Sequence, residues 1–311
     1  MVANRGVTRS DELRGHLAML AFSSLVAGSF SLGGRIANEI DPMALTAVRF
    51  AMAAAVMFCI ALATGQVARR TFQSPWRFLV LGGLFAMYFV LMFQGLKTAH
   101  PVSTAAVFTL TPVMAAGFGW LVMRQATSRG MAFGLCLGAA GALWVIFRGN
   151  LSALLGFDVG IGELIFFVGC IAHALYIPLV PKLNRGEGVF ASAFGTMAGG
   201  AIVVGVLGLQ RISTTEWSAL PGLVWLVLVY LVIFASVASI SLIQFASLRL
   251  KAAKVMAYTY LIPSWVILWE LALDGDVPSV ILLPGVVMTV CALILLLLEG
   301  RNHVRRSSGS A

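Results

Sequence analysis

QGLKTAHPVSTAAVFTLTP, residues Gln94–Pro112, lies where one apolar run of the sequence ends and the next begins. A related stretch, QFASLRLKAAKVMAYTYLIP, occupies Gln244–Pro263. In both, a leucine and a basic residue precede a few small or polar residues and then an apolar segment that a proline interrupts. The two prolines, Pro112 and Pro263, are 151 positions apart in a chain of 311 residues. This spacing predicts a duplicated unit.

The composition of the chain is that of an integral membrane protein. It is 60% hydrophobic and only 11% charged, with a mean hydropathy of +0.96. A soluble domain has charged residues at about a quarter of its positions, so we expect lipid to surround this chain. The net charge of +9 is spread over short loops, and no basic patch with interleaved aromatics predicts a nucleic-acid partner. The four cysteines form no CxxC pair, so no metal site or disulfide framework is predicted.

Apolar runs of roughly 20 residues match the thickness of a bilayer core. The sequence contains ten, at residues 15–36, 42–64, 76–96, 102–123, 129–148, 160–180, 189–209, 221–247, 253–272 and 278–299. We therefore predict an all-α integral membrane fold with ten transmembrane helices.

The basic residues predict the orientation of the chain. Sixteen of the 21 Lys and Arg residues fall in segments on the same side as the N-terminus, four fall on the other side, and Arg49 lies within a span. Both termini are therefore predicted to be cytoplasmic.

The half-chain repeat gains a meaning from this topology. Five spans is an odd number, so the second copy enters the membrane from the side opposite to the first, as two inverted repeats. The predicted parts are a tail at 1–14, repeats at 15–149 and 150–300, and a second tail at 301–311. Alternating access needs two nearly equivalent packings, which an inverted duplication supplies, so this layout favours a transporter.

The sequence also resembles a known family, the EamA branch of the drug/metabolite transporter superfamily. The residues that carry the resemblance are Gly28-Ser29-Phe30, Pro42 with Arg49-Phe50, Leu96–Pro112, Gly130–Gly141, Gly162-Glu163, Ala172–Tyr176 and Leu248–Pro263. Within the superfamily the chain is most similar to bacterial YddG-type exporters of aromatic amino acids. The resemblance implies ten helices in two inverted five-helix repeats, a place in the bacterial inner (plasma) membrane, and a small organic metabolite as substrate.

The chain departs from the family pattern at three places. Ala27 stands where a tryptophan is usual, Arg124-Gln125 where Gly-Glu is common, and His173 where a tryptophan is frequent. These departures weaken the transfer of a substrate from generic family members.

The substrate site of such a fold should lie near the middle of the membrane, where the two halves meet. The candidate substrate-binding residues are His173, Gln244, Tyr88, Tyr176, Ser239, Tyr258, Thr109 and Ser29, and Pro112 and Pro263 are candidate helix breaks near the cavity. For each serine and threonine the alternative is a hydroxyl that bonds to its own helix carbonyl or serves in helix packing.

His173 is the sharpest candidate because it is the histidine placed near the centre of a span, where an ionisable group is costly. It suits a substrate carboxylate, an aromatic ring or a coupling proton, and the alternative is a neutral histidine that a neighbouring helix satisfies. Gln244 offers both a donor and an acceptor, and Tyr88 a ring and a hydroxyl; their alternatives are contacts between helices. Arg49 is interpreted as structural, extending outward or pairing with Glu39 or Asp41.

No P-loop, GxGxxG, HExxH or GxSxG motif is present, so no catalytic residue, cofactor or enzymatic activity is predicted. We expect a secondary transporter that exports aromatic and other neutral amino acids, with lipid and its substrate as partners and no obligate protein partner. One alternative is an exporter of drug-like cations or another metabolite, which would favour an acidic group at mid-depth. A lipid-modifying membrane enzyme is a more distant alternative, and a structural or receptor role fits an inverted duplication poorly.

Overall fold

The structure is a computed structural model, and its regular elements are helices in the part of the chain that it describes. The described residues are 9–67, 72–124, 127–150, 152–153, 159–247, 249–250, 255, 257–273 and 279–308. The helices of the first half are α1 (Arg9–Ile36), α2 (Pro42–Ala63), α3 (Trp76–Gly95), α4 (Pro101–Phe108), α5 (Thr111–Met123) and α6 (Arg129–Ile146). Those of the second half are α8 (Ile161–Leu183), α9 (Val189–Leu207), α10 (Leu209–Thr214), η2 (Trp217–Ala219), α11 (Gly222–Val232), η3 (Ile233–Ala238), α12 (Ser239–Ser247), η4 (Tyr258–Leu261), α14 (Ile262–Leu273), η5 (Val280–Leu282) and α15 (Leu283–Ser308).

The predicted all-α membrane fold is confirmed. Within the described ranges, nine helical spans are long and apolar enough to cross a membrane, and the shorter apolar helix Tyr258–Leu273 corresponds to the predicted ninth span. The start of that span lies among residues 251–254 and 256, outside the description. α1 begins at Arg9, earlier than the predicted start at residue 15, and α15 continues to Ser308, past the predicted end at 299.

The fourth span is broken one turn before its proline. α4 ends at Phe108, and the amides of Thr109 and Leu110 bond to carbonyls three residues back, as in a 3₁₀ turn. α5 then starts with Pro112 in its first turn, where a missing N–H is tolerated. The ninth span repeats this pattern, since the 3₁₀ turn η4 precedes α14 and its Pro263. Helix breaks at both predicted prolines are thus present.

The eighth span contains an irregularity that no proline marks. Its middle turn, η3, is a π-helix between α11 and α12. The hydroxyl of Ser236 donates to the Leu231 carbonyl, and that of Ser239 to the Phe234 carbonyl, each five residues back. A π-turn leaves backbone groups outside the usual helical pattern and is frequent at functional sites.

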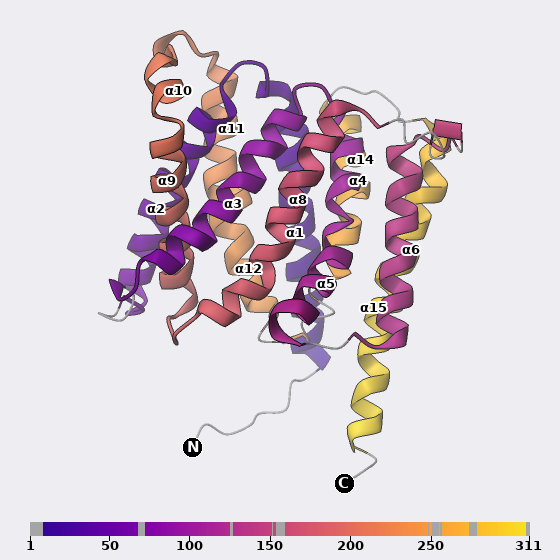
Figure 1. Cartoon of the computed structure of the whole chain (residues 1–311). Coiled ribbons are helices and arrows are strands. Elements are labelled where there is room, and N and C mark those ends of the chain that lie inside the picture. The colour runs from indigo at the N-terminus through magenta and orange to yellow at the C-terminus, as the bar shows by residue number, and fades with distance from the viewer. Residues whose placement is uncertain are drawn as a thin grey trace.

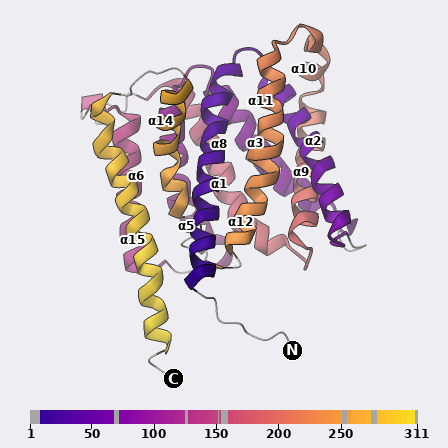
Figure 2. The same ribbon diagram turned by 180° about the vertical axis from the view of Figure 1, so that it is seen from behind.

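α6 and α15 pair along one edge of the bundle, on the right in Figure 1 and on the left in Figure 2. A Cβ built on Gly141 would lie 2.7 Å from the Gly285 carbonyl oxygen, and one on Gly285 the same distance from the Gly141 oxygen. Gly134 faces the Ala292 carbonyl in the same way, at 3.7 Å. Since 134 and 141 become 285 and 292 on adding 151, each contact maps onto the other, as a two-fold relation between the halves requires.

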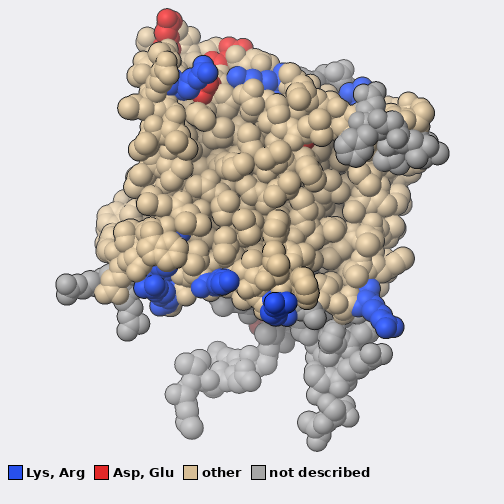
Figure 3. All heavy atoms as spheres, in the orientation of Figure 1, with Lys and Arg blue, Asp and Glu red and all other residues tan. Residues whose placement is uncertain are grey.

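The first and last described helices begin and end at the same end of the bundle, the lower one in Figure 1. We call this the terminal end and the other the opposite end. Figure 3 shows basic side chains along the rim of the terminal end, and acidic and basic ones together at the opposite end. At the terminal end, Arg77 at the start of α3 bonds to Glu187 in the α8–α9 loop at 2.7 Å, and Arg185 bonds to Ser74.

Candidate functional site

Six ring side chains from α3, α4 and α8 meet in the middle of the bundle. We call them the aromatic cluster; its members are Phe85, Tyr88, Phe108, Phe166, His173 and Tyr176. The ring of His173 lies 4.7 Å from that of Tyr88, 5.5 Å from Phe108 and 5.9 Å from Phe85, centroid to centroid. Because α3 and α4 belong to the first half and α8 to the second, the cluster joins the two halves.

His173 has an unused polar atom in this cluster. Its Nδ1 is buried and has no hydrogen-bond partner among the described residues. A buried polar group without a partner costs free energy, and no neighbouring helix supplies a partner for this atom in the described part of the chain. A ligand hydroxyl, amine or carboxylate would supply the missing partner.

Tyr88 and Tyr176 flank His173 from two helices. Tyr88 in α3 is 3% exposed, and Tyr176 in α8 stacks on Phe85 at 4.9 Å with an interplanar angle of 22°. Phe85, Phe108 and Phe166, which were not among the candidates from the sequence, complete the cluster. Only their packing distinguishes them from the other phenylalanines of the chain.

The small hydroxyl candidates bond to their own helices. Ser29 donates to the Val26 carbonyl at 2.6 Å and Thr109 to the Ala106 carbonyl at 2.7 Å. Ser239 bonds to a carbonyl of its own span, as described above. All three residues are buried. Each hydroxyl already donates to a carbonyl of its own helix, which is the alternative to substrate binding that was stated for serine and threonine.

Tyr258 lies apart from the aromatic cluster. Its hydroxyl contacts Nδ1 of His16 at 2.7 Å, which links η4 to the first turns of α1, and it belongs to a separate buried group with Tyr260. The side chain of Gln244 lies outside the described residues, although its backbone is part of α12. Pro112 and Pro263 are buried next to the two helix breaks.

The expectation that Arg49 extends outward or pairs with Glu39 or Asp41 was wrong. Its side chain is 1% exposed and does not extend outward. Nε and Nη2 donate to Ser236 Oγ at 3.3 and 3.1 Å, and the guanidinium carbon lies 3.8 Å above the Phe89 ring. No carboxylate pairs with it within the described part of the chain, and its buried Nη1 has no partner there. Distance from the helix start could not reveal which face of α2 carries Arg49.

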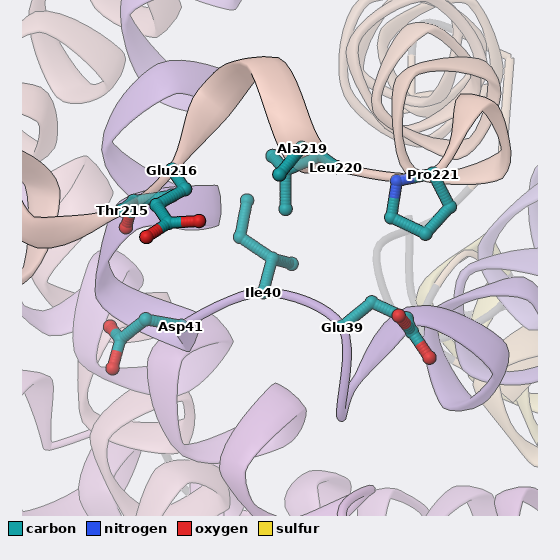
Figure 4. A pocket seen from close by; sticks show the side chains of 8 residues that line it. All are labelled: Glu39, Ile40, Asp41, Thr215, Glu216, Ala219, Leu220 and Pro221. Carbon is teal, nitrogen blue, oxygen red and sulfur yellow. The ribbon is translucent and has the colours of Figure 1, made fainter.

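Two hollows lie away from the aromatic cluster. The first, of about 360 Å³, is at the opposite end, where Ile40 sits between the acidic residues Glu39, Asp41 and Glu216 (Figure 4). Asp41 is already engaged there, because its carboxylate caps α2 by accepting from the amides of Met43 and Ala44. The second, of about 390 Å³, is an apolar groove between α5 and α6.

Comparison with known proteins identifies relatives of this chain. Residues 13–147 and 160–298 each match the model of the EamA-like transporter family. An uncharacterized transporter of Bacillus subtilis (strain 168), YyaM, is 27% identical over 71% of this chain and 73% of its own length. The S-adenosylmethionine/S-adenosylhomocysteine transporter of Chlamydia muridarum is 25% identical over 63% of this chain and 62% of its own length.

A solved crystal structure shares the fold. It superposes with a TM-score of 0.67 over 94% of this chain and 98% of its own, at 20% sequence identity. The two family matches cover most of the chain and fall one on each half. The chain is therefore a multi-pass membrane transporter that belongs to the EamA-like transporter family.

Proposed function

We propose that the protein is a secondary exporter of aromatic and other neutral amino acids, working by alternating access in a bacterial inner membrane with both termini cytoplasmic. The absence of a nucleotide-binding motif from the sequence means that a gradient, or the substrate's own concentration, drives transport. The basic rim at the terminal end supports the orientation.

The observation that carries this proposal is the aromatic cluster around His173. Rings pack favourably against other rings at centroid separations of about 4.5–7 Å, so rearrangement of Tyr88 and Tyr176 would offer an aromatic side chain stacking surfaces. The unpartnered Nδ1 of His173 would meet a polar group of the substrate. The cluster lies where the halves meet, as a site alternately open to each side requires.

Uptake into proteoliposomes tests the proposal. Purified protein should move labelled phenylalanine and tryptophan above empty liposomes, and His173→Ala should reduce that flux at least about tenfold, since a charge-assisted or buried hydrogen bond is lost. Thr289→Ala is the matched control, because this buried hydroxyl donates to the Val286 carbonyl of its own helix and Thr289 is not a candidate site residue. No flux for any of a panel of amino acids would refute the proposal.

A second substrate class is favoured by the relative from Chlamydia muridarum, which is an S-adenosylmethionine/S-adenosylhomocysteine transporter. An adenine ring would stack in the same cluster as a phenylalanine ring. Flux of S-adenosylmethionine without flux of phenylalanine would assign this chain to that class. Purely cationic drugs are disfavoured because the buried charge described at mid-bundle, Arg49, is positive.

A further inference from the structure

Arg49 is a cation held inside the bundle without a counter-ion among the described residues. A buried charge is costly unless it is paired, and ionisable groups within membrane spans face cavities, partners or substrates. Ser236 and Phe89 satisfy part of the guanidinium through two hydrogen bonds and ring stacking. Neither carries a negative charge, so the positive charge itself stays uncompensated in the part of the chain that the structure describes.

The contacts of Arg49 fix its orientation and leave one edge free. Ser236 occupies Nε and Nη2, and Phe89 covers a face of the guanidinium plane. Nη1 remains buried and without a partner in the described ranges. A purely structural arginine would be expected to use this donor as well, since burying it unpaired costs free energy.

Arg49 lies where the two halves of the chain meet. Arg49 is in the first half, and Ser236 is in the π-helical turn of the second half, so the contact crosses between the halves. Irregular helix turns at the repeat interface are where secondary transporters bind their substrates. The Phe89 ring under Arg49 is 4.7 Å from the ring of Tyr88, which contacts His173 at the same separation. Arg49 therefore adjoins the aromatic cluster.

We infer that Arg49 binds the carboxylate of the substrate through Nη1, with the substrate's ring directed toward the aromatic cluster. This inference rests on the proposed function and narrows it: the transported molecules carry a carboxylate, and an amine alone is insufficient. Guanidinium groups recognise carboxylates through directed, charge-assisted hydrogen bonds. The substrate would then supply the negative charge that the described residues lack.

The test measures ligand-induced thermal stabilisation of the detergent-purified protein with two probes. 3-Phenylpropionate has a ring and a carboxylate but no amine, whereas phenethylamine has the ring and the amine but no carboxylate. Wild-type protein should bind the acid at least about tenfold more tightly than the amine. Arg49→Gln should lose this preference, while Arg211→Gln, which removes an exposed charge at the opposite end, should keep it.

Arg49→Lys is a second variant for the case that Arg49→Gln does not fold. Lysine keeps the positive charge but lacks the planar set of N–H donors of the guanidinium group. Arg49→Lys should retain the preference for the acid with affinity reduced about tenfold. Equal stabilisation of wild type and Arg49→Gln by 3-phenylpropionate, or stabilisation of wild type by the amine alone, would overturn the inference.

The probes also separate this inference from the proposed function. Phenylalanine flux with an acid preference that survives Arg49→Gln refutes the role of Arg49 and leaves the function standing. Acid binding that depends on Arg49, without flux of any amino acid, refutes the function and supports Arg49 as the carboxylate-binding residue of a different transporter. If wild-type protein binds neither probe, the inference fails.

Discussion

Glu187 shows how a single carboxylate joins segments at the terminal end. It accepts from Arg77 at 2.7 Å and from the Arg185 amide at 2.7 Å, and the side chains of Arg77 and Glu187 are 2% and 1% exposed. Burial raises the pKa of the Glu187 carboxyl, but these hydrogen bonds and the charge of Arg77 outweigh burial and hold the pKa below its usual value. The ionised form is therefore favoured by folding.

Glu187→Gln should destabilise the protein by about 2 kcal/mol at neutral pH, between the values for exposed and fully buried ion pairs. Because the folded pKa is depressed, the stabilisation is present above the unfolded pKa and is lost as pH falls through the folded value. The difference in melting temperature between wild type and variant should thus be large at pH 7.5 and vanish in strong acid. Glu216→Gln, exposed at the opposite end, should leave the melting temperature unchanged, and a pH-independent difference for Glu187→Gln would contradict the prediction.

Some of the candidate residues could be predicted one by one, and others required packing. His173 and Tyr88 were selected because polar groups are rare at mid-span, and the structure brings them together. Phe108 is one of 20 phenylalanines, so composition alone could not single it out. Arg49 was misjudged because its depth along α2 was known while its face was not, and the face decides whether it meets water or Ser236.

Among the helices, the pair α6 and α15 offers the sharpest test of packing. Gly141→Ala would place a methyl group 2.7 Å from the Gly285 backbone oxygen, which cannot rotate away. The two helices would have to separate, and we expect a loss of about 1–3 kcal/mol in stability, typical of overpacking. Thermal unfolding of the detergent-purified protein measures it.

Gly117→Ala in α5 is the control for that variant, because no described atom outside its own stretch of helix lies within 4 Å of the position that the new methyl group would take. Removing a helical glycine there should be neutral or stabilise by up to about 1 kcal/mol. Equal melting temperatures for the two variants would show that α6 and α15 tolerate separation.

The irregular helices differ in how well sequence can predict them. The breaks before Pro112 and Pro263 follow from the missing proline N–H, and the sequence predicts both. The π-turn η3 has no such mark, because serines five residues from a carbonyl occur in ordinary helices as well. Its position becomes evident only from the hydrogen bonds, although it carries the partner of Arg49.

At the level of the whole molecule, the two halves are related by contacts as well as by sequence. The family matches fall one on each half, and the Gly141–Gly285 contact maps onto Gly134–Ala292 when 151 is added or subtracted. The boundary between the repeats at 149/150 stays a prediction. In an inverted pair the two halves insert into the membrane in opposite directions. The orientation of one half therefore determines that of the other.

The direction of insertion can be measured with single cysteines in a chain whose Cys59, Cys136, Cys170 and Cys291 are replaced by alanine. Thr64 at the end of α2 is exposed at the terminal end, and Glu216 is exposed at the opposite end. Because basic residues are retained in the cytoplasm, Glu216→Cys should react with a membrane-impermeant maleimide in intact cells, and Thr64→Cys only after permeabilisation. The reverse labelling pattern would place both termini outside the cell and would contradict the predicted orientation. The basic rim of the terminal end would then face the exterior, contrary to the positive-inside rule.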